Sequence, residues 1–304
     1  MTKLNTKKIA IFGSSGHLAK NLIFYLSDNK NVQLFLFSRN KNKVSEFLKE
    51  TSIQKNISIY SYKNFEKNHY DVIINCVGNP QGNDTSTSSI IEINNYYDNK
   101  IIKYLKNNRS SLYIYLSSGA IYGENFENPI NDNSISIFNI KKPYSIYAVS
   151  KLHSELKHRT LYDLNIIDLR IFGFFSRFID MQLNYFLSEI VSALKYNKIL
   201  FTDKINIKRD YIHPFDLYNI IVCCIKKPFV NSSFDVYSKK SVSKFEILDF
   251  MEKKYGLKYK INKKNNSENI KLNYYSNSKK LSSLEYNPKY TSLETIKTEL
   301  EFMF

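Results

Sequence analysis

The segment that most constrains the fold lies near the amino terminus, where an apolar run meets a glycine turn and a helical pattern. The run KIAIF at 8–12 ends at Gly13, and apolar residues recur at helical spacing from His17 onward. In the turn GSSGHLA, Gly13 lets the chain reverse, Gly16 lets backbone approach a ligand, and Ala19 lets the helix pack against the strand.

Amides at the start of a helix attract anions, so this turn predicts a binding site for a dinucleotide pyrophosphate. The expected contacts come from Gly13, Ser15, Gly16, His17 and Leu18. A glycine turn that binds no ligand is the alternative for this segment taken alone.

Four further apolar runs follow, and strands alternate with helical patterns along the chain. The runs cover Val32 to Phe37, Ile57 to Tyr60, Val72 to Val77 and Leu112 to Leu116. We therefore predict an α/β fold with a doubly wound parallel sheet of the Rossmann type. Ligands bind such sheets at the carboxyl ends of the strands, where Val77 and Gly78 end one run and Ser118 follows another.

Arg39 stands just after the second run, where this kind of fold meets the adenosine ribose. An acidic residue there would bind the free 2′-hydroxyl of NAD, whereas Arg39 suits a 2′-phosphate. This favours NADP(H) as cofactor. NAD(H) stays possible, because an arginine in the basic stretch RNKNK is also typical of a solvated surface.

A Tyr–Lys pair supplies the candidate catalytic groups. Tyr147 and Lys151 are four residues apart in the glycine-free stretch PYSIYAVSKLHSE at 143–155, so a helix would present both on one face. The same spacing occurs at Tyr96 and Lys100, Tyr259 and Lys263, and Tyr275 and Lys279. Only the Tyr147 pair lies on the element that follows, after a polar loop at 124–142, a strand with a serine, Ser118, at its end, and we therefore favour it.

The net charge of +16 raises the alternative of nucleic-acid binding. The lysines are scattered among asparagines and isoleucines without a concentrated basic arm, so a compositional bias explains them better and we expect no nucleic-acid partner. The basic balance still favours an anionic small substrate.

No apolar run reaches the ~18 to 20 residues that cross a bilayer, and the start lacks a signal-peptide pattern. The three cysteines have neither disulfide nor metal-ligand spacing, so we expect no metal, no membrane association and a cytoplasmic location.

Several short motifs follow one another in a fixed order along nearly the whole chain. They are GSSGHLA at 13–19, DVIINCVG at 71–78, EIN at 92–94, LSSGAIYG at 116–123, YAVSK at 147–151, LRIF at 169–172 and RDYIHPFDL at 209–217. Together with the closing segment 276–299, this set resembles the extended short-chain dehydrogenase/reductase family, which contains nucleotide-sugar epimerases, dehydratases and reductases.

The resemblance implies roles for five residues. Ser118 takes the place of the catalytic Ser/Thr, Tyr147 that of the acid/base, and Lys151 that of its partner. Arg209 would hold the diphosphate of a nucleotide-diphosphate sugar, and Asn184 would lie near the same group.

Two residues of the RDYIHPFDL motif have structural alternatives. For Arg209 the alternative is an ion pair with Asp210 or Asp216. His213 is better explained as a packed structural histidine than as a catalyst.

The resemblance also implies a homodimer and a discontinuous domain structure. Residues 1–173 and 205–228 would form the dinucleotide-binding domain. Residues 174–204 and 229–304 would form a smaller substrate domain for the nucleotide sugar.

Departures from the family pattern reduce the number of reactions that we expect the protein to catalyse. Gly119 and Ala120 follow Ser118, where sugar 4,6-dehydratases carry an Asp-Glu pair, so a dehydratase is not expected. Ala120 also replaces the cysteine of the epimerase-reductases that make activated fucose. The chain reads RIFGFFSR where the family has RxFNxxGP, which changes the residues near the substrate.

Our first hypothesis is an NADPH-dependent reductase of a nucleotide-activated keto-deoxysugar at carbon 4, with surface polysaccharide synthesis as the expected pathway. A free tyrosine, with a pKa near ~10, is too weak an acid at neutral pH, and the Lys151 ammonium would lower that pKa. Arg39 favours a reductase, because net reduction needs exchangeable NADPH. The alternatives are an NAD-dependent 4-epimerase and, in another class, a non-catalytic NADP-sensing binding protein.

Overall fold

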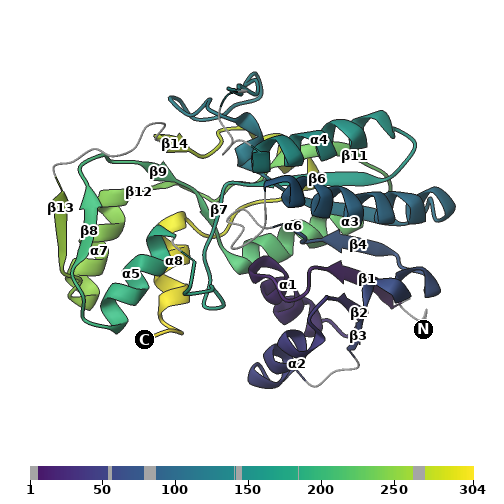
Figure 1. The fold of residues 1–304 in the computed structure, drawn as a ribbon, viewed down its shortest axis with the longest axis horizontal. Coiled ribbons are helices and arrows are strands. Elements are labelled where there is room, and N and C mark those ends of the chain that lie inside the picture. Colours follow the sequence, from purple (N-terminus) through teal and green to yellow (C-terminus); the bar gives the residue numbers. More distant parts are fainter. Residues whose placement is uncertain are drawn as a thin grey trace.

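A seven-stranded sheet with helices on both faces dominates the molecule (Figure 1). The computed structural model describes residues 6–53, 57–78, 87–139, 141, 146–183, 185–262 and 271–304. The strand order is β11-β6-β5-β4-β1-β2-β3, and every neighbouring pair is parallel. The strands are β1 (Lys7–Phe12), β2 (Val32–Phe37), β3 (Ser58–Tyr60), β4 (Val72–Asn75), β5 (Leu112–Ser118), β6 (Ile166–Ile171) and β11 (Asn231–Asp235).

Alternate residues of β1 enter two separate apolar cores, which explains why both faces of the sheet are covered. Ile9 and Ile11 pack with α1 (His17–Ser27), α2 (Lys41–Glu50) and α6 (Pro214–Lys226). Ala10 and Phe12 pack on the other face with α3 (Thr87–Asn107), beside which lies α4 (Ile146–Thr160). Strands buried on both faces read as continuous apolar runs, as β1 and β4 do here.

A smaller group of elements lies to one side of the large sheet and has its own apolar core (Figure 1). Its helices are α5 (Phe186–Lys195), α7 (Lys244–Tyr255) and α8 (Ser292–Leu300). Its strands are β8 (Leu200–Asp203) with β13 (Tyr259–Asn262), and β9 (Lys208–Arg209) with β12 (Val242–Ser243) and β14 (Asn273–Tyr274). The pair β7 (Gly173–Phe174) and β10 (Tyr211–Ile212) lies between the two parts. The short 3-10 helices are η1 (Tyr62–Lys67), η2 (Gly119–Tyr122) and η4 (Lys280–Leu284).

The predicted α/β class with a doubly wound parallel sheet is confirmed. Two strand ends differ from the prediction, since β4 ends at Asn75 while β5 continues to Ser118. Within the described ranges, no helix is both long and apolar enough to cross a membrane.

The division into two domains stays a prediction, but one of its boundaries needs correction. Strand β11 lies within 229–304, which was assigned to the substrate domain, yet it pairs with β6 at the edge of the large sheet. Its sequence, NSSFD, begins with three polar, half-buried residues, so no apolar run marked it as a strand.

Candidate active site

The glycine turn after β1 has the backbone geometry of a phosphate-binding turn. Gly13 has a φ of +72°, and a Cβ there would lie 3.1 Å from backbone atoms of Cys76. The Gly16 amide donates to the Gly13 carbonyl at 2.9 Å, and Gly16 is the N-cap of α1. The first turn of α1 contains no acidic residue that would repel an anion. These residues fit the pyrophosphate of a dinucleotide, as the sequence predicted for 13–18.

Arg39 lies exposed just beyond the carboxyl end of β2 and forms no ion pair with any described residue. Its charge acts on Tyr62 and Tyr97, whose rings are 4.3 Å apart. Burial raises the pKa of both tyrosines, and Arg39 partly offsets the rise. The Tyr62 hydroxyl also accepts from the Gly13 amide at 3.0 Å, which ties this aromatic pair to the turn.

Sequence reasoning missed Tyr62. It stands at the start of η1, outside every motif, and only the fold brings it to Gly13.

Lys151 projects from α4 toward the carboxyl ends of the parallel strands, where the sequence predicted the site. Its ammonium donates to the Leu116 carbonyl at 2.9 Å and to the Val77 carbonyl at 3.4 Å, and the residue is only 2% exposed. Burial lowers the pKa of Lys151 to about 8, although nearby acidic groups oppose this shift. A Cβ on Gly78 would lie 3.2 Å from Nζ, so Gly78 leaves space directly beside the ammonium.

Ser118 and Tyr147 meet beside this lysine. Ser118 is the last residue of β5, and its Oγ accepts from the Ala120 amide at 3.1 Å. Burial raises the pKa of Tyr147, and a hydrogen bond with Ser118 opposes the rise. The Lys151 ammonium lies 5.9 Å from the centre of the Tyr147 ring. The structure thus brings the three predicted residues together, while the lowering of the Tyr147 pKa by Lys151 stays a prediction.

Tyr274, on β14, is a further hydroxyl at this site that sequence reasoning missed. Its oxygen lies 3.3 Å from the Ser118 oxygen, although 156 positions separate the two residues. Strand β14 reaches the site because it pairs with β9, which carries Arg209. That pairing has no local sequence signal.

Arg209 and Lys271 are two cations that both lie close to the ring of Tyr274. The Arg209 guanidinium lies 5.5 Å from the centre of the Tyr274 ring, and the Lys271 ammonium lies 4.8 Å from it. Arg209 donates to the Lys271 carbonyl at 2.6 Å. Burial lowers the pKa of Lys271 to about 8, and the Arg209 charge lowers it further while Glu124 opposes the shift.

The ion pair considered for Arg209 is absent from the described part of the chain. Asp210 accepts from Ser238 and Ser292, and Asp216 accepts from the amides of Lys289 and Tyr290. Among the described residues, Arg209 therefore has no carboxylate partner, and its charge suits an anion.

The remaining predicted residues differ in placement. Asn184 lies outside the described residues. Tyr185 is the N-cap of α5, and its charge would raise the pKa of Tyr147. The side chain of His17 contacts Ser176 at 2.7 Å, away from the turn's own backbone. His213 caps α6 by accepting from the Phe215 amide and stacks on Tyr290, which is the packed role expected for it.

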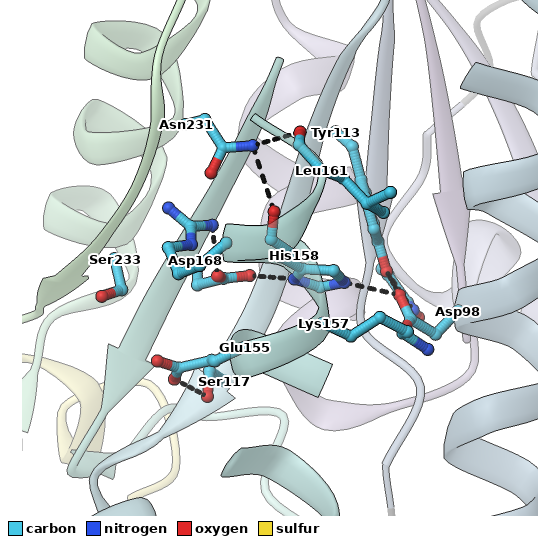
Figure 2. A network of polar contacts seen from close by, with 12 residues as sticks. Asp98, Tyr113, Ser117, Glu155, Lys157, His158, Leu161, Asp168, Asn231 and Ser233 are labelled. Atoms are coloured by element: carbon cyan, nitrogen blue, oxygen red, sulfur yellow. Dashed lines mark hydrogen bonds and ion pairs between the residues drawn. The ribbon is translucent and has the colours of Figure 1, made fainter. Parts of the chain in front are cut away.

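A buried polar network holds the inner face of α4 against the sheet (Figure 2). His158 lies between Asp168 at 2.6 Å and Asp98 at 2.8 Å, and all three side chains are fully buried. One turn earlier, Glu155 accepts from Ser117 and pairs with Arg170 at 2.7 Å. Lys151, Glu155 and His158 are spaced along one helical face, so this network fixes the height and rotation of Lys151. In the described ranges, no cluster of His, Cys, Asp or Glu could hold a metal ion.

Comparison with known proteins places this architecture in a family. The model of the NAD dependent epimerase/dehydratase family matches residues 9–238, and the chain belongs to this family. It is 25% identical to an uncharacterized protein of Methanocaldococcus jannaschii, with 96% of this chain and 94% of that protein covered.

Solved structures share the fold over the whole chain. UDP-N-acetylglucosamine 4-epimerase of Methanobrevibacter ruminantium, in complex with UDP-N-acetylmuramic acid, has a TM-score of 0.82 at 18% identity, covering 98% of each chain. UDP-glucuronic acid 4-epimerase of Bacillus cereus, in complex with UDP-glucuronic acid and NAD, has a TM-score of 0.80 at 15% identity, covering 97% of this chain and 98% of that one. UDP-glucose 4-epimerase of Bifidobacterium longum, in complex with NAD+ and UDP, has a TM-score of 0.77 at 18% identity, covering 98% of each chain.

Proposed function

We propose that the protein is an NADPH-dependent reductase of a nucleotide-activated keto-deoxysugar, acting at carbon 4. The observation that carries the choice of cofactor is Arg39, exposed at the end of β2 and without an ion-pair partner among the described residues. A guanidinium in this position suits the 2′-phosphate that distinguishes NADPH from NADH. A cofactor that is consumed in each turnover must exchange with solution, which suits a reductase.

Ser118, Tyr147 and Lys151 each have a separate role in the proposed reaction. A bound nicotinamide supplies the hydride that reduces the ketone carbon. Ser118 hydrogen-bonds the reacting oxygen, and Tyr147 gives that oxygen its proton. Lys151 is positioned by two strand-end carbonyls, beside the space left by Gly78, where it can hold the nicotinamide ribose.

Arg209 and Lys271 supply the substrate anchor in this proposal. Both cations lie on the ring of Tyr274, whose hydroxyl contacts Ser118. A diphosphate bound there would hold the attached sugar within reach of the catalytic groups. Binding far from the reacting carbon orients the substrate without taking part in the chemistry.

Cofactor titration of purified protein by fluorescence tests the proposal. We expect NADPH to bind more tightly than NADH, and Arg39→Ala to lose this preference, with a change of about 10-fold or more for one charged contact. Arg109→Ala is the matched control, since Arg109 is an exposed arginine paired with Asp163. Tighter binding of NADH to the wild type would contradict the reductase.

A 4-epimerase with resident NAD is the second candidate. It is favoured by the three solved neighbours named above, which are 4-epimerases and of which two were solved with NAD. An epimerase regenerates its cofactor in every cycle and retains it. Denatured protein that releases one equivalent of NAD would therefore support the epimerase and exclude the reductase.

We also propose that the protein forms a homodimer through the outer faces of α3 and α4. Tyr96 on α3 is 62% exposed, and Val149 and Leu156 on α4 are 43% and 59% exposed. Apolar side chains gathered on adjacent helices are typical of an association surface. Light scattering should give twice the mass of 35.8 kDa, and Leu156→Glu should shift it toward the monomer.

A further inference from the structure

Ser176, in the segment after β7, connects the two parts of the molecule through its side chain. Its Oγ accepts from the Asn21 side-chain amide at 2.9 Å and from the Phe178 amide at 3.1 Å. The same Oγ lies 2.7 Å from His17 Nε2. Ser176 is fully buried and Asn21 is 1% exposed, whereas His17 and Phe178 are half-buried.

The hydrogen-bond inventory fixes the direction of the contact with His17. A hydroxyl has two acceptor sites and one proton, and two amides already occupy the acceptor sites of Ser176. Ser176 therefore donates to His17 Nε2, which must be unprotonated. Burial lowers the pKa of His17 to about 3, and the Lys20 charge lowers it further, so the ring is neutral at physiological pH. The ring proton then resides on Nδ1.

His17 lies within the phosphate-binding turn, because it is the first residue of α1 and follows the N-cap Gly16. The residue that starts the phosphate-binding helix is thus the one that holds Ser176. The His17 ring also packs edge-on against Phe174, with ring centres 5.0 Å apart. Two contacts therefore join the start of α1 to the chain around β7.

The next residue, Arg177, is held from the other part of the molecule. Its backbone amide and its Nε donate to Glu299 of α8 at 2.8 and 2.9 Å. Strand β7, which His17 contacts through Phe174, pairs with β10, and β10 begins two residues after Arg209. The chain at Ser176 and Arg177 is consequently held by both α1 and α8, and the strand before it lies against the strand that follows Arg209.

We propose that His17 is a positioning residue that, through Ser176 and Phe174, couples the phosphate-binding turn to β7 and, through the pairing of β7 with β10, to the strand that follows Arg209. Binding of the dinucleotide and binding of the substrate's nucleoside diphosphate then reinforce each other. The inference rests on the proposed function only in requiring that both nucleotides bind.

Calorimetric titration in the presence and absence of saturating NADPH measures this coupling. The probe is whichever of UDP, dTDP, GDP and ADP binds wild type most tightly. We expect NADPH to tighten its binding about fivefold or more in the wild type. In His17→Phe and Ser176→Ala we expect less than about a twofold change, because the connecting hydrogen bond is gone. His17→Gln should stay closer to the wild type, since its amide oxygen can accept from Ser176.

His153→Phe is the matched control, because His153 is exposed and contacts only Asn95 among the described side chains. It should leave the coupling unchanged. Equal coupling in wild type, His17→Phe and Ser176→Ala would overturn the inference.

Hydrogen exchange separates this inference from the proposed function. In ligand-free protein, His17→Phe should speed exchange of the Phe178 amide about 3- to 10-fold, and His153→Phe should not. Adding NADPH should slow exchange there in the wild type but not in His17→Phe. If no nucleoside diphosphate binds, the proposed function fails and exchange alone decides the inference. Unchanged exchange at Phe178 in His17→Phe would then overturn it.

Discussion

Two groups of charged side chains are withdrawn from water in this molecule, and they differ in what surrounds the charges. Beneath α4, His158 lies between Asp98 and Asp168, so opposite charges meet within 2.8 Å (Figure 2). Beside β14, Arg209 donates to two carbonyl groups and lies near the Tyr274 ring, and the Lys271 ammonium lies over aromatic rings, with no carboxylate in ion-pair distance among the described residues.

A buried charge without a partner is unfavourable, and a satisfied group of opposite charges holds its own elements together. In the network beneath α4, His158, Arg159 and Arg170 each have an oppositely charged partner within the chain, and the consequence is structural, because these contacts keep Lys151 at the carboxyl ends of the strands. In the described ranges the Arg209 and Lys271 pair has no carboxylate at ion-pair distance, and only the charge of Glu124 opposes the shift of the Lys271 pKa. We therefore propose that the first group stabilises the fold and that the second binds the anionic substrate.

Asp168→Ala should have the largest effect on the first group. It leaves His158 and Arg159 without their shared carboxylate, and breaking a buried ion pair lowers the free energy of unfolding by about 3 to 5 kcal/mol. Urea unfolding measures the loss. Asp163→Ala is the control, because Asp163 pairs with Arg109 at the surface and should contribute at most about 1 kcal/mol. Similar losses in both variants would remove the distinction between the groups.

Arg209→Ala should lower the affinity for a nucleoside diphosphate and leave the free energy of unfolding nearly unchanged. The free energy of unfolding should be nearly unchanged, because no carboxylate in the described part of the chain loses its partner. Affinity for a nucleoside diphosphate should fall about 10- to 100-fold, as expected for a hydrogen bond between charged groups. Calorimetry with UDP and urea unfolding give the two quantities, and Lys208→Ala, at the exposed neighbouring lysine, is the control. A large loss of stability with unchanged affinity would make Arg209 structural.

The pH dependence of unfolding should separate the groups by sign. Burial opposes the charge of His158, yet Asp168 and Asp98 raise its pKa from 6.5 to about 9, so its stabilisation is complete below pH 6.5 and is lost as pH rises through 9. Burial lowers the pKa of Lys271 from 10.5 to about 8, so the folded state binds fewer protons than the unfolded state between these values. The contribution of Lys271 to stability therefore rises with pH across that range.

Urea unfolding of wild type, His158→Asn and Lys271→Met from pH 6 to 10 checks these signs. The stability difference between wild type and His158→Asn should shrink as pH rises. The difference for Lys271→Met should change in the opposite direction. Parallel pH profiles for all three proteins would contradict the assigned charge environments.

The sequence was informative where structure is local. The glycine turn at 13–19 and the alternation of apolar runs with helical patterns predicted the sheet, since each depends on neighbours in the chain. The spacing of Tyr147 and Lys151, with a serine at the preceding strand end, predicted three residues that the structure brings together.

The residues missed from sequence reach the site by long-range pairing. Tyr274 and Lys271 arrive through the pairing of β14 with β9, more than 60 positions away. Tyr62 arrives through a short 3-10 helix. Strand β11 escaped notice because an edge strand of polar, half-buried residues has no apolar run. The contact of the His17 side chain with Ser176 could not be predicted either, because 159 positions separate the two residues.

The most direct test of the central claim is to follow NADPH oxidation with nucleotide-activated 4-keto-deoxysugars as substrates, using wild type and Tyr147→Phe. The account predicts turnover by the wild type and a loss of about 100- to 10,000-fold in kcat for Tyr147→Phe, with nucleotide affinity retained. The protein should also be purified without bound NAD. A protein that retains NAD and oxidises no NADPH, or a Tyr147→Phe variant as active as the wild type, would contradict it.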